Sequence, residues 1–182
     1  DMREAGAMVH VTFGINIVVD TSSRHSGLFC GEFDKAWQAS CSYVQKGYGL
    51  PIDYQADVVI ASCGGFPKDL NFYQSTKTLF NASRAVKEGG TLIMLAECPE
   101  GSGSKDFFDW IKPLSKGCLD EALRASFTIG GYIFYAACES IRRSKTLLLS
   151  SMEPELVRDM GVRSFKDMKD LLAEVDLSLI HI

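Results

Sequence analysis

Residues 56–63 read ADVVIASC and residues 64–67 read GGFP, and this junction decides the fold. A continuous β-branched and apolar run bounded by turn residues is typical of a strand buried on both faces. Two glycines and a proline then break the chain. Helical spacing of apolar residues follows over residues 72–87, and Gly89 and Gly90 end that helix. The sequence therefore predicts a strand, a turn and a crossover helix.

The same alternation continues toward the C-terminus. Residues 91–96 (TLIMLA) and 146–149 (TLLL) predict two more buried strands. Helices are predicted over the other segments, at residues 107–111, 121–126, 132–142, 152–160 and 165–175. Strands that alternate with helices build a parallel sheet covered by helices.

Upstream of the junction, residues 9–20 and 28–31 predict two strands joined by a turn cluster, which makes a β-hairpin. Residues 34–46 have apolar side chains at helical spacing. The hairpin would make the sheet mixed. We therefore expect one α/β domain of three layers, with a mixed, mostly parallel sheet covered by helices and an N-terminal β-hairpin.

Composition bounds the class of protein. The 182 residues are 46% hydrophobic and 23% charged, which is ordinary for a soluble globular chain. The net charge of −4 gives no electrostatic reason to expect a nucleic-acid partner, and no apolar run reaches the ~18 residues of a membrane helix. Six cysteines form no C-x-x-C pair. We expect a reduced, cytoplasmic protein without a membrane partner.

The two ends of the chain are unusual. The chain starts at Asp1 without Met, in what reads as the last turns of a helix. It ends in LSLIHI, residues 177–182, which matches the in-frame translation of a common adapter used in DNA library preparation. We expect truncation at both ends, a domain that covers residues 1–176, and a non-native tail at residues 177–182.

Two strand ends are candidate ligand sites, because open α/β sheets bind ligands beyond the carboxyl ends of their strands. Residues 62–65 (SCGG) follow one predicted strand and residues 97–103 (ECPEGSG) follow the next. If the strands are neighbours, these loops lie side by side. Gly64 and Gly65 would let a ligand approach the backbone closely. Glycine is also the ordinary turn residue, so both interpretations stay open.

The start of the predicted helix is more informative. Lys77 lies four positions after Tyr73 and three positions after Gln74, so the three side chains share one side of the first turns of the helix. A phenol, a carboxamide and an ammonium at a helix N-terminus suit a small anion or a hydroxy acid. A solvated helix face is the alternative, and spacing does not decide between them. Asp69 or Asn71 can cap the helix.

Four strand-end residues are weaker candidates. Glu97 and Glu100 could act as general acid or base, but no histidine is near them in sequence and loop carboxylates are usually solvated. Cys63 and Cys98 also end strands. No activating His or Lys pairs with them, which favours buried, inert thiols.

The remaining candidates are isolated side chains. His10 and His25 are more typical of structural residues, and two isolated histidines make no metal site. Tyr132 follows Gly130 and Gly131 at a helix start, where it would either stack on a flat ligand or pack in the core.

The motifs around the junction form a recognisable set: SCGG at 62–65, FPKD at 66–69, NFYQSTK at 71–77, and AEC at 96–98 with EGSG at 100–103. This set resembles the C-terminal domain of the nickel-dependent lactate racemase family. That family shows Gly-Gly-[Tyr/Phe]-Pro-Lys-Asp and a Tyr-Gln-x-x-Lys helix start at these places. Weaker similarity runs from about Met8 to Leu172.

The resemblance implies an enzyme that interconverts stereoisomers of 2-hydroxy acids. Its members use a nickel pincer nucleotide, a pyridinium mononucleotide whose carbon and two sulfurs hold nickel, and the implied reaction is hydride transfer to and from this cofactor. Lys77 and Gln74 are implied to be catalytic, holding the substrate or the polar edge of the cofactor. Tyr73 would line the pocket near the pyridinium ring, together with Gly64 and Gly65. Tyr132 would stand where relatives place an aromatic residue or a histidine.

In the resembled family the proton-transfer histidines, the nickel-ligating histidine and the cofactor-attaching lysine lie in an N-terminal domain. This sequence has no such domain, so we expect it to hold half of an interdomain site whose partners are that domain and a small 2-hydroxy acid. Two other hypotheses remain. One is a relative that acts on a different substrate, such as a sugar acid. The other is a non-catalytic nucleotide-binding or regulatory module.

Overall fold

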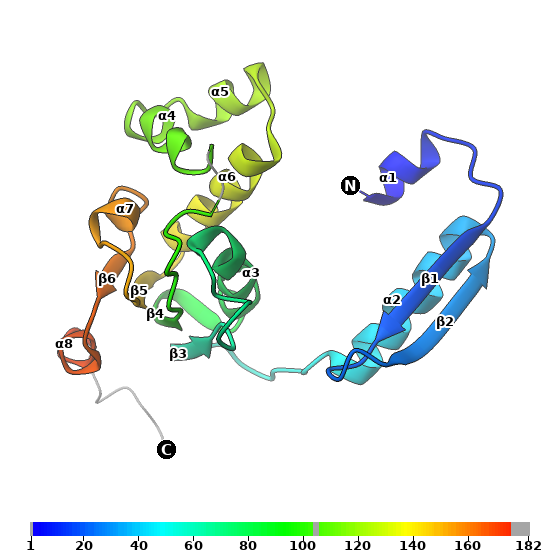
Figure 1. The fold of residues 1–182 in the computed structure, drawn as a ribbon, viewed down its shortest axis with the longest axis horizontal. Helices are drawn as coiled ribbons and strands as arrows, with labels where there is room; N and C mark the ends of the chain where they lie inside the picture. Colours follow the sequence, from blue (N-terminus) through cyan, green and yellow to red (C-terminus); the bar gives the residue numbers. More distant parts are fainter. Residues whose placement is uncertain (1, 104–105, 176–182) are drawn as a thin grey trace. The chain divides into compact units, whose positions relative to one another are not determined.

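The computed structural model describes residues 2–103 and 106–175, so the tail predicted at residues 177–182 lies outside the described residues. The chain divides into two compact units, Asp1–Pro51 and Ile52–Ile182 (Figure 1). The sequence predicts one domain instead. The physical reason for the difference is that the hairpin and its helix bury side chains against each other, and so form a small core of their own.

The first unit is a hairpin with a helix on one face. Its elements are α1 (Met2–Ala7), β1 (Gly14–Val19), β2 (His25–Gly31) and α2 (Phe33–Tyr48). β1 and β2 pair antiparallel, and α2 packs on both strands. Val18 of β1 and Ala36 of α2 are buried. The predicted hairpin and the helix after it are therefore confirmed.

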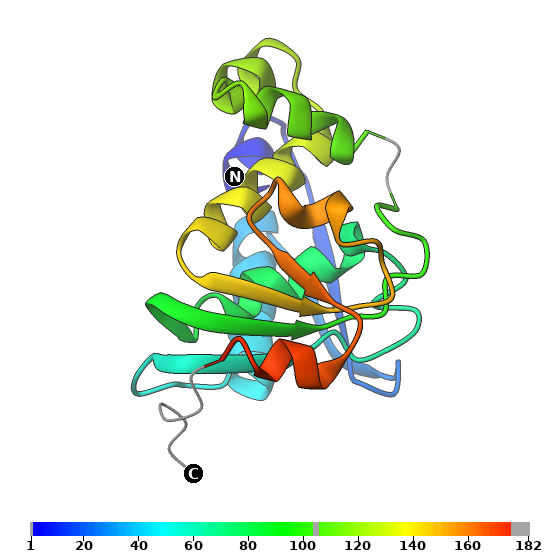
Figure 2. The same ribbon diagram turned by 90° about the vertical axis from the view of Figure 1, so that its left-hand side faces the viewer.

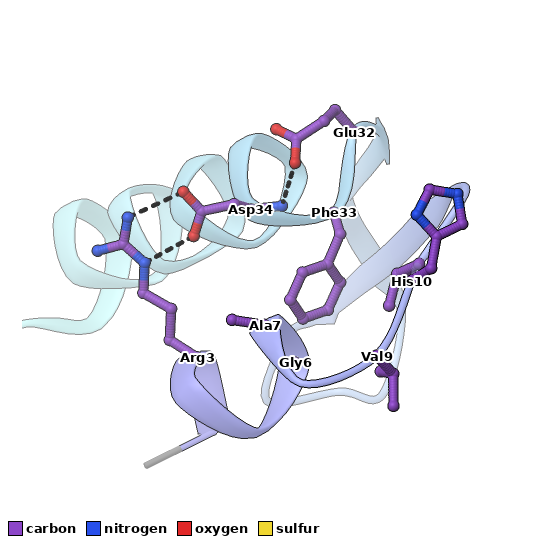
Figure 3. A pocket seen from close by; sticks show the side chains of 9 residues that line it. Arg3, Gly6, Ala7, Val9, His10, Glu32, Phe33 and Asp34 are labelled. Carbon is purple, nitrogen blue, oxygen red and sulfur yellow. Dashed lines mark hydrogen bonds and ion pairs between the residues drawn. The ribbon is translucent and has the colours of Figure 1, made fainter.

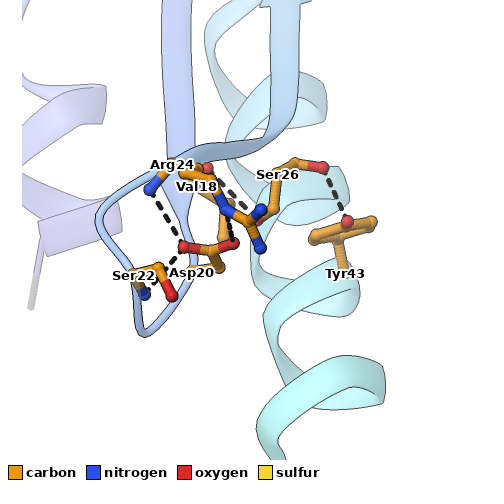
Figure 4. A network of polar contacts seen from close by, with 6 residues as sticks. All are labelled: Val18, Asp20, Ser22, Arg24, Ser26 and Tyr43. Carbon is orange, nitrogen blue, oxygen red and sulfur yellow. Dashed lines mark hydrogen bonds and ion pairs between the residues drawn. The ribbon is translucent and has the colours of Figure 1, made fainter.

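Side-chain hydrogen bonds stabilise the turn end of this hairpin (Figure 4). The Asp20 carboxylate accepts the backbone N–H groups of Ser22 at 2.8 Å and Arg24 at 2.9 Å. The hydrogen bond from the Arg24 N–H is the largest of the effects that lower the pKa of Asp20. At the other strand, the Tyr43 hydroxyl donates to the Ser26 carbonyl at 2.7 Å, which ties α2 to β2.

The second unit is an α/β domain built on a four-stranded parallel sheet, in the order β3-β4-β5-β6. Its elements in chain order are β3 (Ala56–Ser62), α3 (Phe72–Ala82), β4 (Val86–Leu95), η1 (Phe108–Trp110), α4 (Ile111–Ser115), α5 (Leu119–Ala125), α6 (Ile129–Arg142), β5 (Lys145–Leu149), α7 (Glu155–Arg158), β6 (Arg163–Phe165) and α8 (Met168–Leu172). The α/β class is confirmed. The hairpin forms a separate sheet, so this sheet is entirely parallel and not mixed.

Alternate side chains of the central strands enter two cores. Leu92 and Met94 of β4 join the larger core under α3 and α6. Ile93, between them, joins a smaller core with Leu171 of α8 on the opposite face. Figure 2 shows α6 and α8 on opposite sides of the sheet. The sheet is thus the middle of three layers, and the α8 layer is the thinner one.

Several predicted elements differ in extent. α3 ends at Ala82, not near residue 87, because Val86 is buried and already pairs with Ala56 in the sheet. The helix predicted over residues 152–160 is reduced to the four residues of α7. The short strand β6 was not predicted, and it displaces the start of the last helix to Met168.

β3 is an edge strand, and its Ile60 side chain is 58% exposed. The apolar run predicts burial on both faces, which is wrong for this strand. The short helix α8 contacts β5 and β6. On the same face of β3, Val58 packs against the core that includes Leu171 of α8, while Ile60 stays exposed. Composition alone does not distinguish such an edge strand from a central one.

These positions give a matched test of the core. Leu92→Ala should lower the free energy of unfolding by about 2–5 kcal/mol, because it opens a cavity under α3 and α6. Ile60→Ala on the neighbouring strand should cost less than about 1 kcal/mol, since that side chain is already hydrated. Urea unfolding followed by far-ultraviolet circular dichroism measures both. Equal losses would contradict the assigned faces of the sheet.

Candidate functional site

The carboxyl ends of β3, β4 and β5 meet at one edge of the sheet. Ser62 pairs with Leu95, and Leu95 pairs with Leu149, so the three strands end level with one another. A pocket of about 660 Å³ opens there. Its lining comes from the last residues of these strands, the loops that follow them and Lys166: Ser62, Gly65, Asp69, Leu95, Ala96, Glu97, Leu149, Ser150, Ser151 and Lys166. The prediction that the two strand-end loops lie side by side is confirmed.

Carboxylates and hydroxyls supply five of the ten residues that line this strand-end pocket, and the polar remainder is Lys166. Asp69 is 7% exposed, and its carboxylate accepts the backbone N–H of Glu97 at 3.1 Å. The Ser150 hydroxyl donates to the Glu97 carbonyl at 2.8 Å. The ammonium of Lys166 is paired with Glu153 at 2.8 Å. Such a pocket suits neutral or cationic polar groups better than an anion.

The glycine turn at the pocket is required by the backbone. Gly64 and Gly65 have φ angles of +83° and +72°, in the left-handed region that favours glycine. The Gly64 N–H donates to the Ser62 hydroxyl at 3.1 Å, and open space surrounds the position of a Cβ on Gly65. Gly64 and Gly65 are therefore favoured by the geometry of the turn, and Gly65 also lines the strand-end pocket.

The start of α3 orders its polar side chains. Asn71, not Asp69, is the N-cap, and its Oδ1 accepts the Gln74 N–H at 3.0 Å. The Lys77 ammonium donates to the Gln74 Oε1 at 2.8 Å. Tyr73 is half-buried, with its ring edge-on to Phe107 at 5.8 Å between centroids. The structure thus joins Gln74 to Lys77 directly, while Tyr73 is held by the core.

Tyr132 lies apart from this group. It is 51% exposed at the start of α6, and its ring is 6.3 Å from that of Phe127. Core packing of Tyr132 is therefore excluded. Within the described part of the chain, no hydrogen bond or ring contact joins Tyr132 to Gln74 or Lys77.

The strand-end thiols are buried. Cys63 and Cys98 are both inaccessible, and Cys98 has a φ of +51°. Burial raises the pKa of the Cys98 thiol, and the hydroxyl of Ser75 contacts its sulfur at 3.5 Å. Burial also raises the pKa of Cys138, to about 12. The thiols of Cys98 and Cys138 therefore stay protonated near neutral pH, so they are poor nucleophiles.

His10 lies in the first unit, beside a pocket of about 410 Å³ (Figure 3). Arg3 and Asp34 form a two-point ion pair at one side of that pocket, with Nη2–Oδ2 at 2.9 Å and Nε–Oδ1 at 2.7 Å. His25 is exposed on β2. Across residues 2–103 and 106–175, no group of three or more His, Cys, Asp or Glu side chains is arranged to hold a metal ion.

Among the pocket residues that were not predicted as site residues, Asp69 and Ser150 hold the backbone of Glu97. Asp69 was considered only as a helix cap. Ser150 directly follows the predicted strand 146–149, so the strand-end rule that identified residues 62–65 would also have identified it.

None of the helices in the described residues is long and apolar enough to cross a membrane.

Comparison with known proteins decides the family. The model for the lactate racemase C-terminal domain matches residues 52–177, and its first residue is that of the second compact unit. This chain belongs to the lactate racemase family. Unit two is the lactate racemase C-terminal domain, and it contains Tyr73, Gln74 and Lys77.

Two relatives and one solved structure give the extent of the similarity. The lactate racemase of Thermoanaerobacterium thermosaccharolyticum is 37% identical over 94% of this chain and 42% of its own length. That of Lactiplantibacillus plantarum is 33% identical over 68% of this chain and 29% of its own length. The structure of the Thermoanaerobacterium lactate racemase apoprotein matches with a TM-score of 0.79 at 27% identity. The match covers the whole of this chain and 44% of the racemase chain. The chain spans less than half the length of these lactate racemases.

Thiol labelling tests the assignment of buried cysteines in this lactate racemase family member. Brief treatment with iodoacetamide at about pH 8 should modify Cys30 and Cys41, which are exposed, and leave Cys98 and Cys138 unmodified. Peptide mass spectrometry reads each site, and labelling in denaturant provides the control. Rapid modification of native Cys98 would contradict a protonated, buried thiol and would return it to the candidate nucleophiles.

Proposed function

We propose that this chain forms the C-terminal part of a racemase or epimerase of 2-hydroxy acids, with lactate or a related acid as substrate. The observation that supports it most strongly is the family match over residues 52–177 together with the joined Gln74–Lys77 pair at the start of α3. The reaction class is taken from the names of the relatives, and the residues proposed to bind the substrate are chosen from the contacts at the start of α3.

The Gln74–Lys77 pair has the chemistry to hold a 2-hydroxy acid. An ammonium has three donors, and one N–H of Lys77 already donates to Gln74. Two donors remain for the carboxylate of the substrate. The Gln74 side-chain amide N–H₂ is a further donor for the substrate's oxygens. This pair therefore suits the acid better than the carboxylate-lined strand-end pocket does.

Tyr73 would stand beside the bound substrate or cofactor. Its ring is fixed edge-on against Phe107, which itself packs against Phe134. A ring held in this way loses little further freedom when a flat group binds. Gly64, Gly65 and Tyr132 remain proposed binding residues: the two glycines stand at the turn beside the strand-end pocket, and Tyr132 stands exposed at the start of α6.

The proposal includes the nickel pincer nucleotide as cofactor. The donors at the start of α3 are an ammonium, a carboxamide and a phenol, which fit the substrate and the polar edge of a nucleotide but not nickel. When bound, the cofactor would supply the hydride chemistry at the α-carbon of the substrate. This chain would bind and orient the acid, while an N-terminal domain would provide the nickel ligands, the proton-transfer groups and the covalent attachment.

A non-catalytic nucleotide-binding or regulatory module is the second candidate function. The position of the strand-end pocket favours it, since α/β sheets commonly bind nucleotides at such an edge. The carboxylates and hydroxyls of this pocket would suit the neutral base or sugar of a nucleotide better than its phosphate. A sugar acid in place of lactate is a variant of the first candidate. A panel of 2-hydroxy acids, assayed with a hybrid enzyme, distinguishes the three.

The hybrid joins the N-terminal part of the Thermoanaerobacterium racemase to this chain. With cofactor supplied, we expect interconversion of L- and D-lactate or of a related acid, measured by chiral chromatography. This chain alone should neither bind nickel tightly in equilibrium dialysis nor racemise any acid. A folded hybrid that turns over no acid in the panel would favour the binding module.

Within the active hybrid, Lys77→Ala should lower kcat/KM by at least about 10-fold, because it removes the cation that holds the substrate's carboxylate. Lys87→Ala is the matched control. Lys87 of β4 is also exposed, but its ammonium is paired with the carboxylate of Asp57 at 2.8 Å. Removing the Lys87 side chain should leave kcat/KM unchanged. Equal rates for Lys77→Ala and the unsubstituted hybrid would remove Lys77 from the site.

A further inference from the structure

The loop Glu97–Gly103, which follows β4, is here called the clamp loop because its backbone is hydrogen-bonded to the segment at the start of α3. Four backbone hydrogen bonds join them, two given by the loop and two by the segment around the cap. They are Cys98 N to Asp69 O at 2.9 Å, Glu100 N to Leu70 O at 3.0 Å, Phe72 N to Gly101 O at 2.8 Å and Tyr73 N to Ser102 O at 3.2 Å. A helix start is usually free on its outer side, whereas this one is enclosed by a second strand-end loop.

Asn71 lies at the centre of this contact and is 6% exposed. Its Oδ1 accepts the Gln74 N–H, and its Nδ2 donates to the Glu100 Oε2 at 3.4 Å. A Cβ added to Gly103 would come within 2.0 Å of the Asn71 Cγ. The amide is therefore pressed between the helix and the clamp loop, and the loop needs glycine at position 103 for that reason.

The contacts continue from Asn71 to the proposed substrate-binding cation. Asn71 holds the backbone of Gln74, and the Gln74 Oε1 accepts the Lys77 ammonium at 2.8 Å. A displacement of the clamp loop would move Asn71 and, through it, this pair. Displacements of about 1 Å in such a chain can cost a large factor in rate.

We propose that Asn71 is a positioning residue: held by the clamp loop, it sets the Gln74–Lys77 pair in the orientation that receives the substrate. This rests on the proposed function, since the pair is assigned to the substrate there. An ordinary helix cap would act differently. Asp caps a helix as well as Asn does, so a pure cap tolerates that exchange. A residue whose amide N–H₂ also donates to Glu100 does not tolerate the exchange, because aspartate has no such donor.

The first experiment separates the cap from the clamp contact in the hybrid racemase. Asn71→Asp keeps the acceptor for the Gln74 N–H but places a carboxylate against Glu100. We expect kcat/KM, assayed well below the melting temperature of the variant, to fall by about 10-fold or more. The melting temperature should also fall, because two carboxylates would then meet at a buried contact. Adding Glu100→Gln restores a donor–acceptor pair at that contact and should recover most of the rate. Asn81→Ala on the same helix is the control, because no described hydrogen bond uses its side chain.

The second experiment uses two glycines of the same loop. Gly101 and Gly103 both have positive φ, at +62° and +80°, so alanine strains the backbone at either position. Only Gly103 abuts Asn71, while a Cβ on Gly101 meets only Leu156 at 3.6 Å. Gly103→Ala should therefore lower kcat/KM several-fold more than Gly101→Ala. Equal effects, or full activity in Asn71→Asp, would overturn the proposal.

Hydrogen exchange on this chain keeps the test independent of catalysis. Asn71→Asp should speed exchange of the Phe72 and Tyr73 amides, which donate to the carbonyls of Gly101 and Ser102 in the clamp loop, and Asn81→Ala should not. If the unsubstituted hybrid has no activity, the proposed function fails, and this measurement alone decides whether the clamp loop acts through Asn71. Unchanged exchange at both amides would overturn the clamp.

Discussion

The parallel pairing of β3, β4 and β5 is the constraint on which the rest of the second unit depends. Parallel neighbours cannot be joined by a tight turn, so each connection must cross over the sheet with a helix. α3 is the first of these crossovers, and α6 precedes the strand that completes the next. The same pairing ends the strands level with one another. Loops that are far apart in sequence are thereby brought to one edge.

At that edge, buried polar groups link the loops. The Asp69 carboxylate holds the Glu97 N–H, and the Ser150 hydroxyl holds the Glu97 carbonyl. A buried donor or acceptor without a partner would cost about 1–3 kcal/mol, so these bonds favour one arrangement of the loops. Asn71 extends the arrangement to the start of α3. The polar helix start is therefore oriented by the sheet edge as well as by its own turn.

The two units differ in how they are stabilised. The second unit surrounds its sheet with two cores, the larger of which includes fully buried aromatic rings of Phe72, Phe107 and Phe134. The first unit has one helix on one face of a hairpin. Ile15, Ile17 and Leu28 are exposed on its strands. A hairpin of this size is marginal without a helix to cover it, which makes α2 indispensable there.

The sequence by itself determined the α/β class, the hairpin, the places along the chain of three of the four strands of the parallel sheet, and the family, because apolar periodicity and the motifs of residues 62–77 are local properties of the chain. It also identified Gln74 and Lys77 as neighbours on one helix face. Tertiary structure alone decided that β3 is an edge strand, that the hairpin has its own sheet, that Tyr132 is exposed, and that Asn71 is gripped by the clamp loop. These depend on which segments meet across the sheet, and contacts between residues distant in sequence leave no period or spacing in the chain to reveal them.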